Sequence, residues 1–277
     1  MKKLNMFCIT LDPNHYQFIK KLGYTPVGLG NKNFDNKWFT DKSGINISQK
    51  NINYAECTFH YWIWKNYIDK LDDKWIGFCG YRKFWNLNNL KNENINFKNI
   101  NTEVLTSIPA EFESYDSILA EPMFINQFRG MKFLKKGMKI FLKKPFLFFD
   151  QKKRNLKFHF DLLHGEGILN DAIDLLDQKN KEDFRKFVNK EVSFNPWMMF
   201  ICKSKEKLKN YYEDLFPWLE KCEKLFEPDK LRGYEVRICA FLAERFMPYW
   251  FQKNTKYTTM PVFFYDIRND ITKDEIY

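Results

Sequence analysis

The apolar positions of this chain follow two different spacings along its length. Short apolar runs, bounded by turn residues, predict buried strands at 4–11, 24–30, 75–80, 114–122 and 194–204. Apolar residues that recur at helical spacing predict helices at 14–23, 54–70, 164–178, 205–226 and 233–251. Strands that alternate with helices predict an α/β fold with a mainly parallel sheet flanked by helices, and we expect residues 1–277 to form one domain.

The predicted strand WIGFCG, residues 75–80, ends directly before Tyr81, Arg82 and Lys83. Parallel strands of α/β domains usually present ligand groups at their carboxyl ends. A guanidinium is permanently charged and can hold phosphate oxygens through two parallel hydrogen bonds. We therefore expect Arg82 to contact an anionic ligand, the alternative being an internal salt bridge. If the strand continues, Lys83 should point the opposite way.

The chain is strongly basic and contains no recognisable cofactor-binding motif. The net charge is +10 and 18% of the residues are aromatic, which favours a phosphate-rich partner: nucleotide, anionic lipid or nucleic acid. Neither GxxxxGK[ST] nor GxGxxG is present, so kinase and dehydrogenase functions gain no support. Six scattered cysteines without CxxC spacing predict a reducing cytoplasm, with no disulfide or zinc site. The start of the chain is interpreted as a strand rather than a signal peptide, and no apolar run reaches the ~18 residues of a membrane span.

Residues 129–157 differ in composition from the rest of the chain, with eleven Lys or Arg and a single Asp. On a helical wheel, an apolar face that includes Met131, Leu134 and Met138 lies beside a basic face that includes Lys132 and Lys135. This pattern suits an amphipathic helix in an anionic membrane surface. It suits a packed surface helix with solvated lysines equally well. A nucleic-acid-binding arm is a weaker third interpretation.

Four stretches occur in a characteristic order: YAECTFHYWIWKN, WIGFCGYRKFW, NPWMMFICKS and GYEVRICAFLAERF. Together, over residues 46–265, they resemble a family of bacterial glycosyltransferases long catalogued as a domain of unknown function. That family builds capsular polysaccharide and O-antigen, and its type member is a galactofuranosyltransferase. The resemblance implies a GT-A-like fold without the usual Asp-x-Asp metal motif. Gly80 stands where the family often has His, so a role that needs an imidazole there is not carried over.

The resemblance also suggests what Tyr81 and Arg82 do. In a GT-A enzyme, Asp-x-Asp follows the corresponding strand and holds a divalent ion against the nucleotide diphosphate. Here Tyr81 and Arg82 take that place and are expected to bind the nucleotide sugar, with Arg82 neutralising the departing diphosphate. No divalent metal is therefore expected as a cofactor, although Asp12, Asp116 and Glu121 could still converge in space.

An inverting transfer needs one base to take the proton of the acceptor hydroxyl. Glu235 is placed at the start of the last predicted helix, where many inverting GT-A enzymes have a catalytic carboxylate. A carboxylate favoured there by the helix macrodipole is the alternative. Glu121, at the carboxyl end of its strand, is the second candidate, its alternative being a turn residue before Pro122. Glu244 is expected to pair with Arg245 or Arg237.

The remaining ligand candidates lie at the ends of predicted elements. Thr10 and Asp12 follow the first strand, where GT-A folds hold the nucleotide. His164 is placed near a helix start and assigned to the nucleotide sugar, the alternative being a structural histidine. Asn195, at the start of a buried strand, is assigned to the acceptor.

Two histidine clusters invite a metal-site interpretation. His159, Asp161 and His164 match no strong metal-binding spacing. Glu56 and His60 are four residues apart on one predicted helix, and without a third ligand they are interpreted as a hydrogen-bonded pair. The sequence therefore predicts no metal site.

With the resemblance included, we expect a cytoplasmic, inverting glycosyltransferase, either free or peripheral on the inner face of the inner membrane. It would move galactofuranose or N-acetylgalactofuranosamine from a UDP donor to a growing capsular polysaccharide or O-antigen glycan. The residues alone predict only a basic α/β protein with an anionic ligand. The alternatives are the same fold with a pyranose or heptose donor, a nucleic-acid-binding protein, and a membrane-surface protein without catalysis. Nucleic acid is not the expected partner, because no compact recognition module is present.

Overall fold

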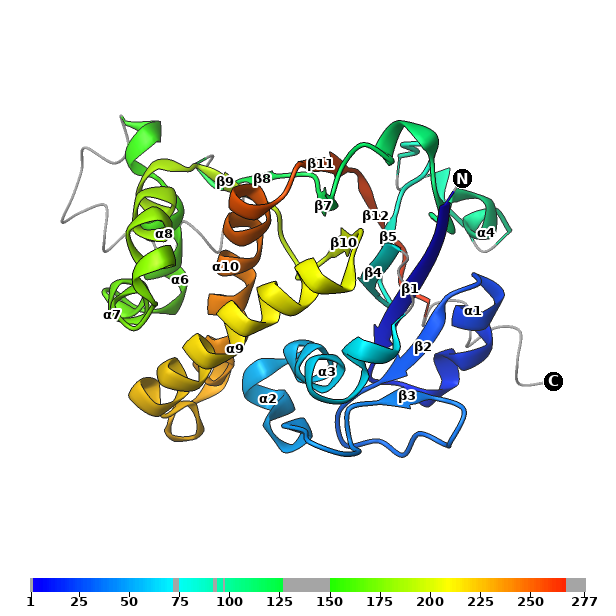
Figure 1. Cartoon of the computed structure of the whole chain (residues 1–277), viewed down its shortest axis with the longest axis horizontal. Coiled ribbons are helices and arrows are strands. Elements are labelled where there is room, and N and C mark those ends of the chain that lie inside the picture. The colour runs from blue at the N-terminus through cyan, green and yellow to red at the C-terminus, as the bar shows by residue number, and fades with distance from the viewer. Residues whose placement is uncertain (1, 72–74, 92–93, 97, 127–149, 268–277) are drawn as a thin grey trace.

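The computed structural model describes residues 2–71, 75–91, 94–96, 98–126 and 150–267. Residues 129–149 of the predicted basic segment lie outside this part of the chain. The end of that segment is described: it forms the 3-10 helix η8 (Gln151–Lys153) and the start of helix α6. Figure 1 shows the described chain as a central sheet with helices around it.

The described residues form a ten-stranded sheet whose main path runs β11-β7-β10-β4-β1-β2-β3. In that order, the strands are Tyr257–Met260, Ser117–Ala120, Phe200–Cys202, Trp75–Gly80, Lys2–Thr10, Thr25–Gly28 and Phe39–Thr40. Along this path β10 is antiparallel to both neighbours, and the other pairs are parallel. The sheet also includes β5 (Lys83–Trp85), β6 (Ser107–Ile108) and β12 (Val262–Phe264). The predicted α/β fold with a mainly parallel sheet is confirmed.

The central strand β1 separates two hydrophobic cores, because successive side chains of a strand point to opposite faces. Leu4, Met6 and Cys8 face the first core, which includes side chains of helix α1 (Tyr16–Lys21). Phe7 and Ile9 face the second core, which is larger and contains side chains of the helices on the other face. The apolar run of β1 is therefore buried on both faces, as in parallel sheets generally.

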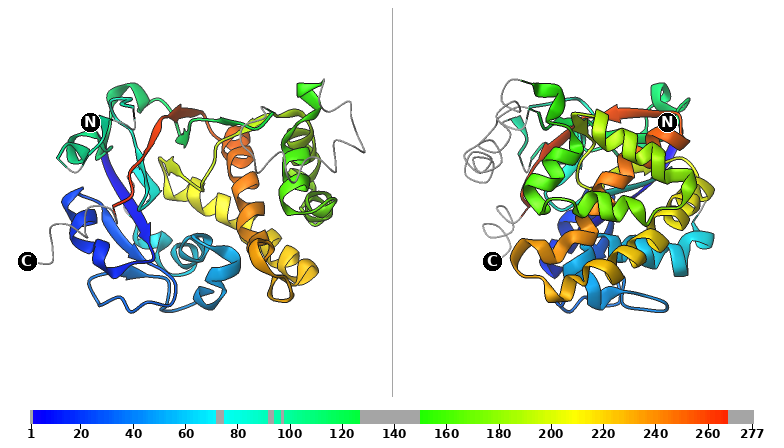
Figure 2. Two further views of the ribbon diagram at one scale, coloured as in Figure 1. Left: turned by 180° about the vertical axis from the view of Figure 1, so that it is seen from behind. Right: turned by 90° about the vertical axis from the view of Figure 1, so that its left-hand side faces the viewer.

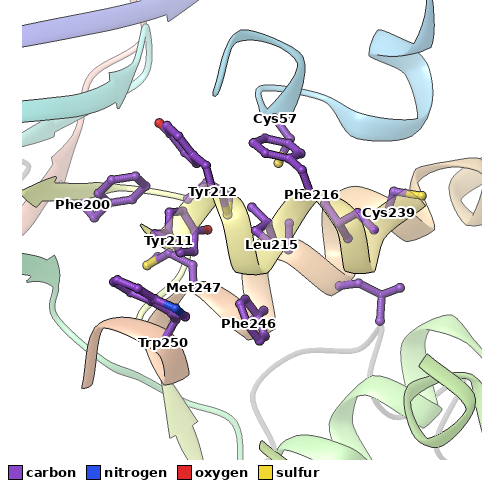
Figure 3. Close-up of a cluster of buried hydrophobic side chains, with 14 of the residues drawn as sticks. Cys57, Phe200, Tyr211, Tyr212, Leu215, Phe216, Cys239, Phe246, Met247 and Trp250 are labelled. Carbon is purple, nitrogen blue, oxygen red and sulfur yellow. The ribbon is translucent and has the colours of Figure 1, made fainter. Parts of the chain in front are cut away.

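Two long helices, α9 (Lys205–Phe226) and α10 (Ile238–Asn254), contribute more side chains to the larger core than any other elements. Figure 3 shows their side chains meeting around Leu215, Phe246 and Trp250. The indole N–H groups of two buried tryptophans in this core are hydrogen-bonded: Trp250 Nε1 donates to Asp214 Oδ2 at 2.8 Å and Trp218 Nε1 to the Ala172 carbonyl at 2.7 Å. Burying an aromatic side chain of this size contributes on the order of 1.5–3 kcal/mol.

A group of helices lies beyond α10, on the side away from β1 and β2 (Figures 1 and 2). These are α6 (Leu156–His164), α7 (Ile168–Asp174) and α8 (Gln178–Lys190). The chain passes between this group and the sheet through the ribbon of β8 (Met123–Phe124) and β9 (Ser193–Phe194). Shorter described elements are η1 (Pro13–His15), η2 (Ser48–Lys50), α4 (Ile100–Glu103), η6 (Ala110–Phe112), η9 (Pro228–Lys230) and η10 (Gly233–Arg237).

Three predicted elements differ from the structure in ways that affect the site. The helix expected at 54–70 is broken at Ala55, whose backbone has φ +48°, between α2 (Asn51–Tyr54) and α3 (Cys57–Trp62). The π-helical turn η3 (Ile63–Tyr67) and the 3-10 turn η4 (Ile68–Lys70) follow. The helix expected at 164–178 forms only as the shorter α7 (Ile168–Asp174), and His164 ends α6 instead of starting a helix. The strand expected at 194–204 is interrupted between β9 and β10 by a loop with left-handed backbone at Trp197 and Met198.

Neither cysteine pairing nor a membrane span contributes to the described structure. All six cysteines lie in the described part of the chain, each buried with a free thiol. No helix among the described residues is both long enough and apolar enough to cross a lipid bilayer.

The buried histidine His60 should make the fold sensitive to acid. Its ring is inaccessible to solvent, and burial lowers its pKa to about 3, against about 6.5 in the unfolded chain. The unfolded state therefore takes up the proton first, so stability is complete above about pH 6.5 and falls as the pH decreases toward 3. By pH 5 this one group should cost about 2 kcal/mol of unfolding free energy.

Urea unfolding at pH 7 and pH 5 measures this loss. His60→Gln removes the titrating ring but keeps polar atoms near the Tyr212 hydroxyl, and its stability should fall less between the two pH values. An equal fall in both proteins would show that His60 does not control the acid sensitivity.

Candidate active site

A cavity of about 510 Å³ lies at the carboxyl ends of β1, β2 and β4. Its size is within the range of small-molecule sites, and its place at parallel strand ends is where α/β sheets usually bind ligands. The lining joins strand ends, the α2–α3 break, the β9–β10 loop, η10 and α10. The lining residues are Ile9, Thr10, Leu11, Leu29, Asn51, Ile52, Ala55, Glu56, Phe78, Cys79, Gly80, Tyr81, Arg82, Lys83, Trp197, Met198, Met199, Tyr234, Arg237, Ala240, Phe241 and Glu244.

A tight turn brings both cations after β4 into this cavity. Gly80 pairs with Lys83 across the two-residue turn of Tyr81 and Arg82, so the chain reverses into β5 instead of continuing. The condition under which Lys83 was expected to point away from Arg82, a strand that continues, is therefore not met, and both residues line the cavity. Burial lowers the pKa of Lys83, whose Nζ lies 5.0 Å from the ring centre of Trp197.

Arg82 is the more exposed of the two cations and stands at the tip of the turn. Its guanidinium lies 4.9 Å from the ring centre of Tyr81, a cation–π distance. A side-chain atom added at Gly80 would meet nothing within 4 Å. The cavity is therefore open beside Tyr81, and a ligand can approach the backbone at the end of β4.

Three cations and two carboxylates of the described chain face the cavity: Arg82, Lys83, Arg237, Glu56 and Glu244. Sequence reasoning missed Lys83, Arg237 and Glu56 as site residues, because four separate elements bring this group together. Clustered positive charge in a cavity favours a phosphate-bearing ligand. Carboxylates beside it can accept protons or hydroxyl hydrogen bonds.

Glu244 is held by two contacts. Its Oε2 lies 2.9 Å from Arg245 Nη1, and its Oε1 accepts a hydrogen bond of 2.8 Å from the backbone N–H of Trp197. The predicted pairing with Arg245 is confirmed. The second contact fixes the strained β9–β10 loop, in which Trp197 has φ +74°, so Glu244 also shapes the cavity wall.

Glu56 has a different environment. Burial raises the pKa of its carboxyl, and the nearby charge of Glu244 raises it further, while Arg237 and Lys83 lower it. The predicted hydrogen-bonded pair of Glu56 and His60 is wrong, since His60 Nδ1 lies 2.8 Å from the hydroxyl of Tyr212. The helix break at Ala55 turns Glu56 toward the cavity instead, and a continuous helical pattern gives no sign of it.

Thr10 and Asp12 follow β1, as predicted, but only Thr10 lines the cavity. Thr10 Oγ1 lies 2.7 Å from His15 Nδ1 and accepts a hydrogen bond from the Asp12 backbone. The Asp12 carboxylate caps η1 and forms a 3.1 Å ion pair with Lys32. Although partial burial acts to raise it, these partners hold the pKa of Asp12 below its usual value.

The other predicted site residues lie outside the lining of the cavity. Glu235 is exposed in η10, and Glu121 is exposed just after β7. His164 is buried behind the wall, with its ring stacked at 4.0 Å on Phe241, which does line the cavity. Asn195 is also buried; its Nδ2 donates to the Ala120 carbonyl at 2.6 Å, and its Oδ1 accepts from Gln252 at 3.0 Å.

The predicted carboxylates do not converge on a metal site in the described chain. Asp12 pairs with Lys32, while Asp116 accepts a hydrogen bond from the backbone of Lys256 at the opposite end of β7. Within the described ranges, no group of three or more His, Cys, Asp or Glu side chains is arranged to hold a metal ion.

The fold of this chain is similar to that of a solved protein structure. The apo structure of WbbM, a bifunctional glycosyltransferase, superposes with a TM-score of 0.70 and 20% sequence identity. The match covers 95% of this chain and 45% of the WbbM chain, so the present chain spans less than half of that protein. This likeness confirms the predicted GT-A-like glycosyltransferase fold.

At the level of sequence, none of the curated proteins matches the chain. The sequence pattern of a family described as "Domain of unknown function (DUF4422)" matches residues 9–255. That range includes the ends of β1 and β4, the α2–α3 break and all of α10. The chain therefore belongs to the DUF4422 family.

Proposed function

We propose that this protein is an inverting glycosyltransferase that moves a hexofuranosyl group, galactofuranose or N-acetylgalactofuranosamine, from a UDP donor. The acceptor is a growing capsular polysaccharide or O-antigen glycan. The observation that carries the proposal is the cavity at the ends of β1, β2 and β4, where cations and carboxylates face one space in a glycosyltransferase fold. The resemblance in sequence supports the choice of sugar and pathway.

The cations are suited to the diphosphate of a nucleotide sugar. Breaking the bond between the sugar and the diphosphate leaves negative charge on the departing UDP, which fixed positive groups stabilise. Arg82 can hold phosphate oxygens in two-pronged geometry, and Lys83 lies beside it in the same turn. Arg237 adds positive charge from η10 across the cavity. These residues, with Tyr81, therefore form the proposed diphosphate site.

The end of β1 and the α2 segment are suited to the nucleoside. Thr10 and Leu29 line the cavity at adjacent strand ends, and Asn51 lines it from α2. Asn51 Nδ2 donates to the Ala55 carbonyl at 2.9 Å and to Thr58 Oγ1 at 3.2 Å. The amide is thereby oriented with its oxygen left as an acceptor, which can bind a ribose hydroxyl or a base N–H.

The test is release of UDP from a panel of UDP-sugars in the presence of a glycan acceptor. We expect the furanosyl donor to be turned over fastest, and the product to have the opposite anomeric configuration. Preference for a pyranose or heptose donor would keep the enzyme class but replace the sugar. Retained configuration would overturn the single-displacement mechanism. Salt-dependent RNA binding without UDP release would overturn the proposed function.

Location at the inner face of the inner membrane is a separate part of the proposal and is supported by the sequence of residues 129–157 alone. Replacing Lys132, Lys135, Lys136 and Lys139 by Gln should weaken binding to anionic vesicles by about 1 kcal/mol per residue. Turnover of a short soluble acceptor should be retained. A variant with four exposed lysines replaced elsewhere, Lys190, Lys209, Lys224 and Lys230, has the same net charge and should still bind. Equal binding of both variants would contradict a specific role for the segment.

A further inference from the structure

The geometry points to Glu56 as the general base of the transfer, a role that rests on the proposed function. Glu56 lines the same cavity as the proposed diphosphate site, on the wall formed by the α2–α3 break. The sequence-based candidates Glu235 and Glu121 are exposed outside that lining. A base must come within hydrogen-bond distance of the acceptor hydroxyl, so a carboxylate inside the cavity is better placed than either.

No structural task occupies the carboxylate of Glu56. The residue precedes α3, yet its side chain makes no capping hydrogen bond to that helix. Its own backbone N–H is the hydrogen-bond donor near it, and among the described residues no other side chain forms an ion pair or hydrogen bond with it. Glu56 can therefore accept a proton from a bound hydroxyl without first breaking a contact with another residue.

The second carboxylate of the cavity is not free in this way. One oxygen of Glu244 is paired with Arg245 and the other with the Trp197 backbone. Taking up a proton would weaken both contacts, which hold a buried cation and a strained loop. Glu244 is therefore assigned as a positioning residue, which fixes Trp197 and adds negative charge near Glu56.

The charges around Glu56 fit the requirements of a base. The charged groups that influence it are Glu244 on α10, Arg237 on η10 and Lys83 on β5. Burial and Glu244 raise its pKa and so strengthen it as a proton acceptor, while the two cations favour its ionised form. Lys83 is influenced by both Arg82 and Glu56. Carboxylates and cations of the cavity are thus close enough to influence one another.

The proposed step is a single displacement. The O–H bond of the acceptor hydroxyl breaks and its proton passes to Glu56. The hydroxyl oxygen forms a bond to the anomeric carbon of the donor sugar. The bond from that carbon to the diphosphate oxygen breaks, and its electron pair leaves on UDP, whose added charge is met by Arg82 and Lys83. One proton and one glycosyl group are thereby transferred, and no other reactant is required.

Replacing Glu56 by Gln keeps the shape of the side chain and removes its basicity. We expect turnover to fall by about 10²–10⁴-fold, with UDP affinity and the melting temperature little changed. Glu235→Gln and Glu121→Gln should remain within about threefold of the wild type, since neither lines the cavity. If Glu56→Gln does not fold, Glu56→Asp keeps a carboxylate and should show reduced turnover with the acid limb of its pH profile still present.

The pH profile supplies a readout that a structural role would not change. Arg237 lowers the pKa of Glu56, so Arg237→Gln should move the acid limb of kcat/KM to higher pH. As the control, Arg232→Gln removes an exposed arginine that is close to Arg237 in the sequence. The acid limb of kcat/KM should not move in this variant.

Full turnover by Glu56→Gln, or an acid limb that Arg237→Gln does not move, would overturn the role of Glu56 and leave the proposed function standing. Loss of turnover in Glu235→Gln or Glu121→Gln alone would return the base to that residue. Failure of the wild-type protein to turn over any UDP-sugar would instead overturn the proposed function itself, and the role of Glu56 with it.

Discussion

Replacing Arg82 by Ala should reduce UDP-sugar turnover by about 10²–10³-fold, the range seen when a group that stabilises transition-state charge is removed. The reason is its place at the tip of the β4–β5 turn, where the guanidinium lines the cavity and can contact two phosphate oxygens at once. Arg82→Lys keeps the charge but loses the two-pronged contact, so it should recover only part of the activity. Turnover and UDP affinity, measured on the same preparations, report both effects.

Two further variants test whether the loss of turnover is specific to the cations of the β4–β5 turn. Lys83→Met should also reduce turnover, because the structure brings Lys83 into the cavity beside Arg82. Arg232→Ala changes the net charge by the same amount as Arg82→Ala at an exposed position outside the cavity, and should leave turnover unchanged. Wild-type UDP affinity and turnover in Arg82→Ala would show that the diphosphate binds elsewhere.

The strands and long helices could be predicted from sequence because their apolar patterns are decided locally. WIGFCG has the continuous apolar run of a strand buried on both faces, and β4 lies between two cores. The segments at 205–226 and 233–251 show helical spacing, and α9 and α10 form there. In each case the apolar residues that become buried lie within the segment itself, so the pattern of that segment is enough to predict the element.

The turns that shape the cavity could not be predicted in this way. Two-residue hairpins favour Asn-Gly or Asp-Gly, but the turn after β4 is Tyr81-Arg82, so the residue types predict the end of the strand at Gly80 without indicating that the chain reverses there. Ala55, Trp197 and Met198 adopt left-handed backbone without being Gly or Asn. Such conformations cost on the order of 1–3 kcal/mol and persist only when surrounding contacts enforce them. Those contacts come from other elements, such as Glu244 on the Trp197 N–H.

Because these local turns could not be predicted from sequence, the carboxylate that faces the cavity could not be predicted either. Glu235 was expected at the start of the last helix, but η10 (Gly233–Arg237) precedes α10 and leaves Glu235 exposed. Glu56 was assigned to a helix pair because a continuous helix would direct it toward His60. Which carboxylate enters the cavity thus depends on a helix break and a 3-10 segment that residue spacing does not reveal.

The pair of Glu244 and Arg245 should give the largest stability effect in the described chain outside the apolar cores. Arg245 is 3% exposed, and its guanidinium lies 3.8 Å from the ring centre of Phe194. Burial lowers the pKa of Arg245, and Glu244 is the strongest of the nearby groups that oppose this. Removing one partner of a buried ion pair leaves an uncompensated charge, so Glu244→Gln should reduce the unfolding free energy by about 3–5 kcal/mol.

Chemical unfolding of four proteins separates charge from packing. The glutamine of Glu244→Gln can still accept the hydrogen bond of Trp197, so its loss of stability reports the unpaired guanidinium. The double variant Glu244→Gln with Arg245→Met removes both charges and should recover most of that loss, because an apolar side chain replaces a desolvated ion. Asp174→Asn breaks the exposed contacts to Lys181 and Arg185 and should cost far less stability than Glu244→Gln, because exposed ion pairs contribute little. A loss in Glu244→Gln no larger than that of Asp174→Asn would show that the Arg245 guanidinium does not depend on the charge of Glu244 for its stability in the folded protein.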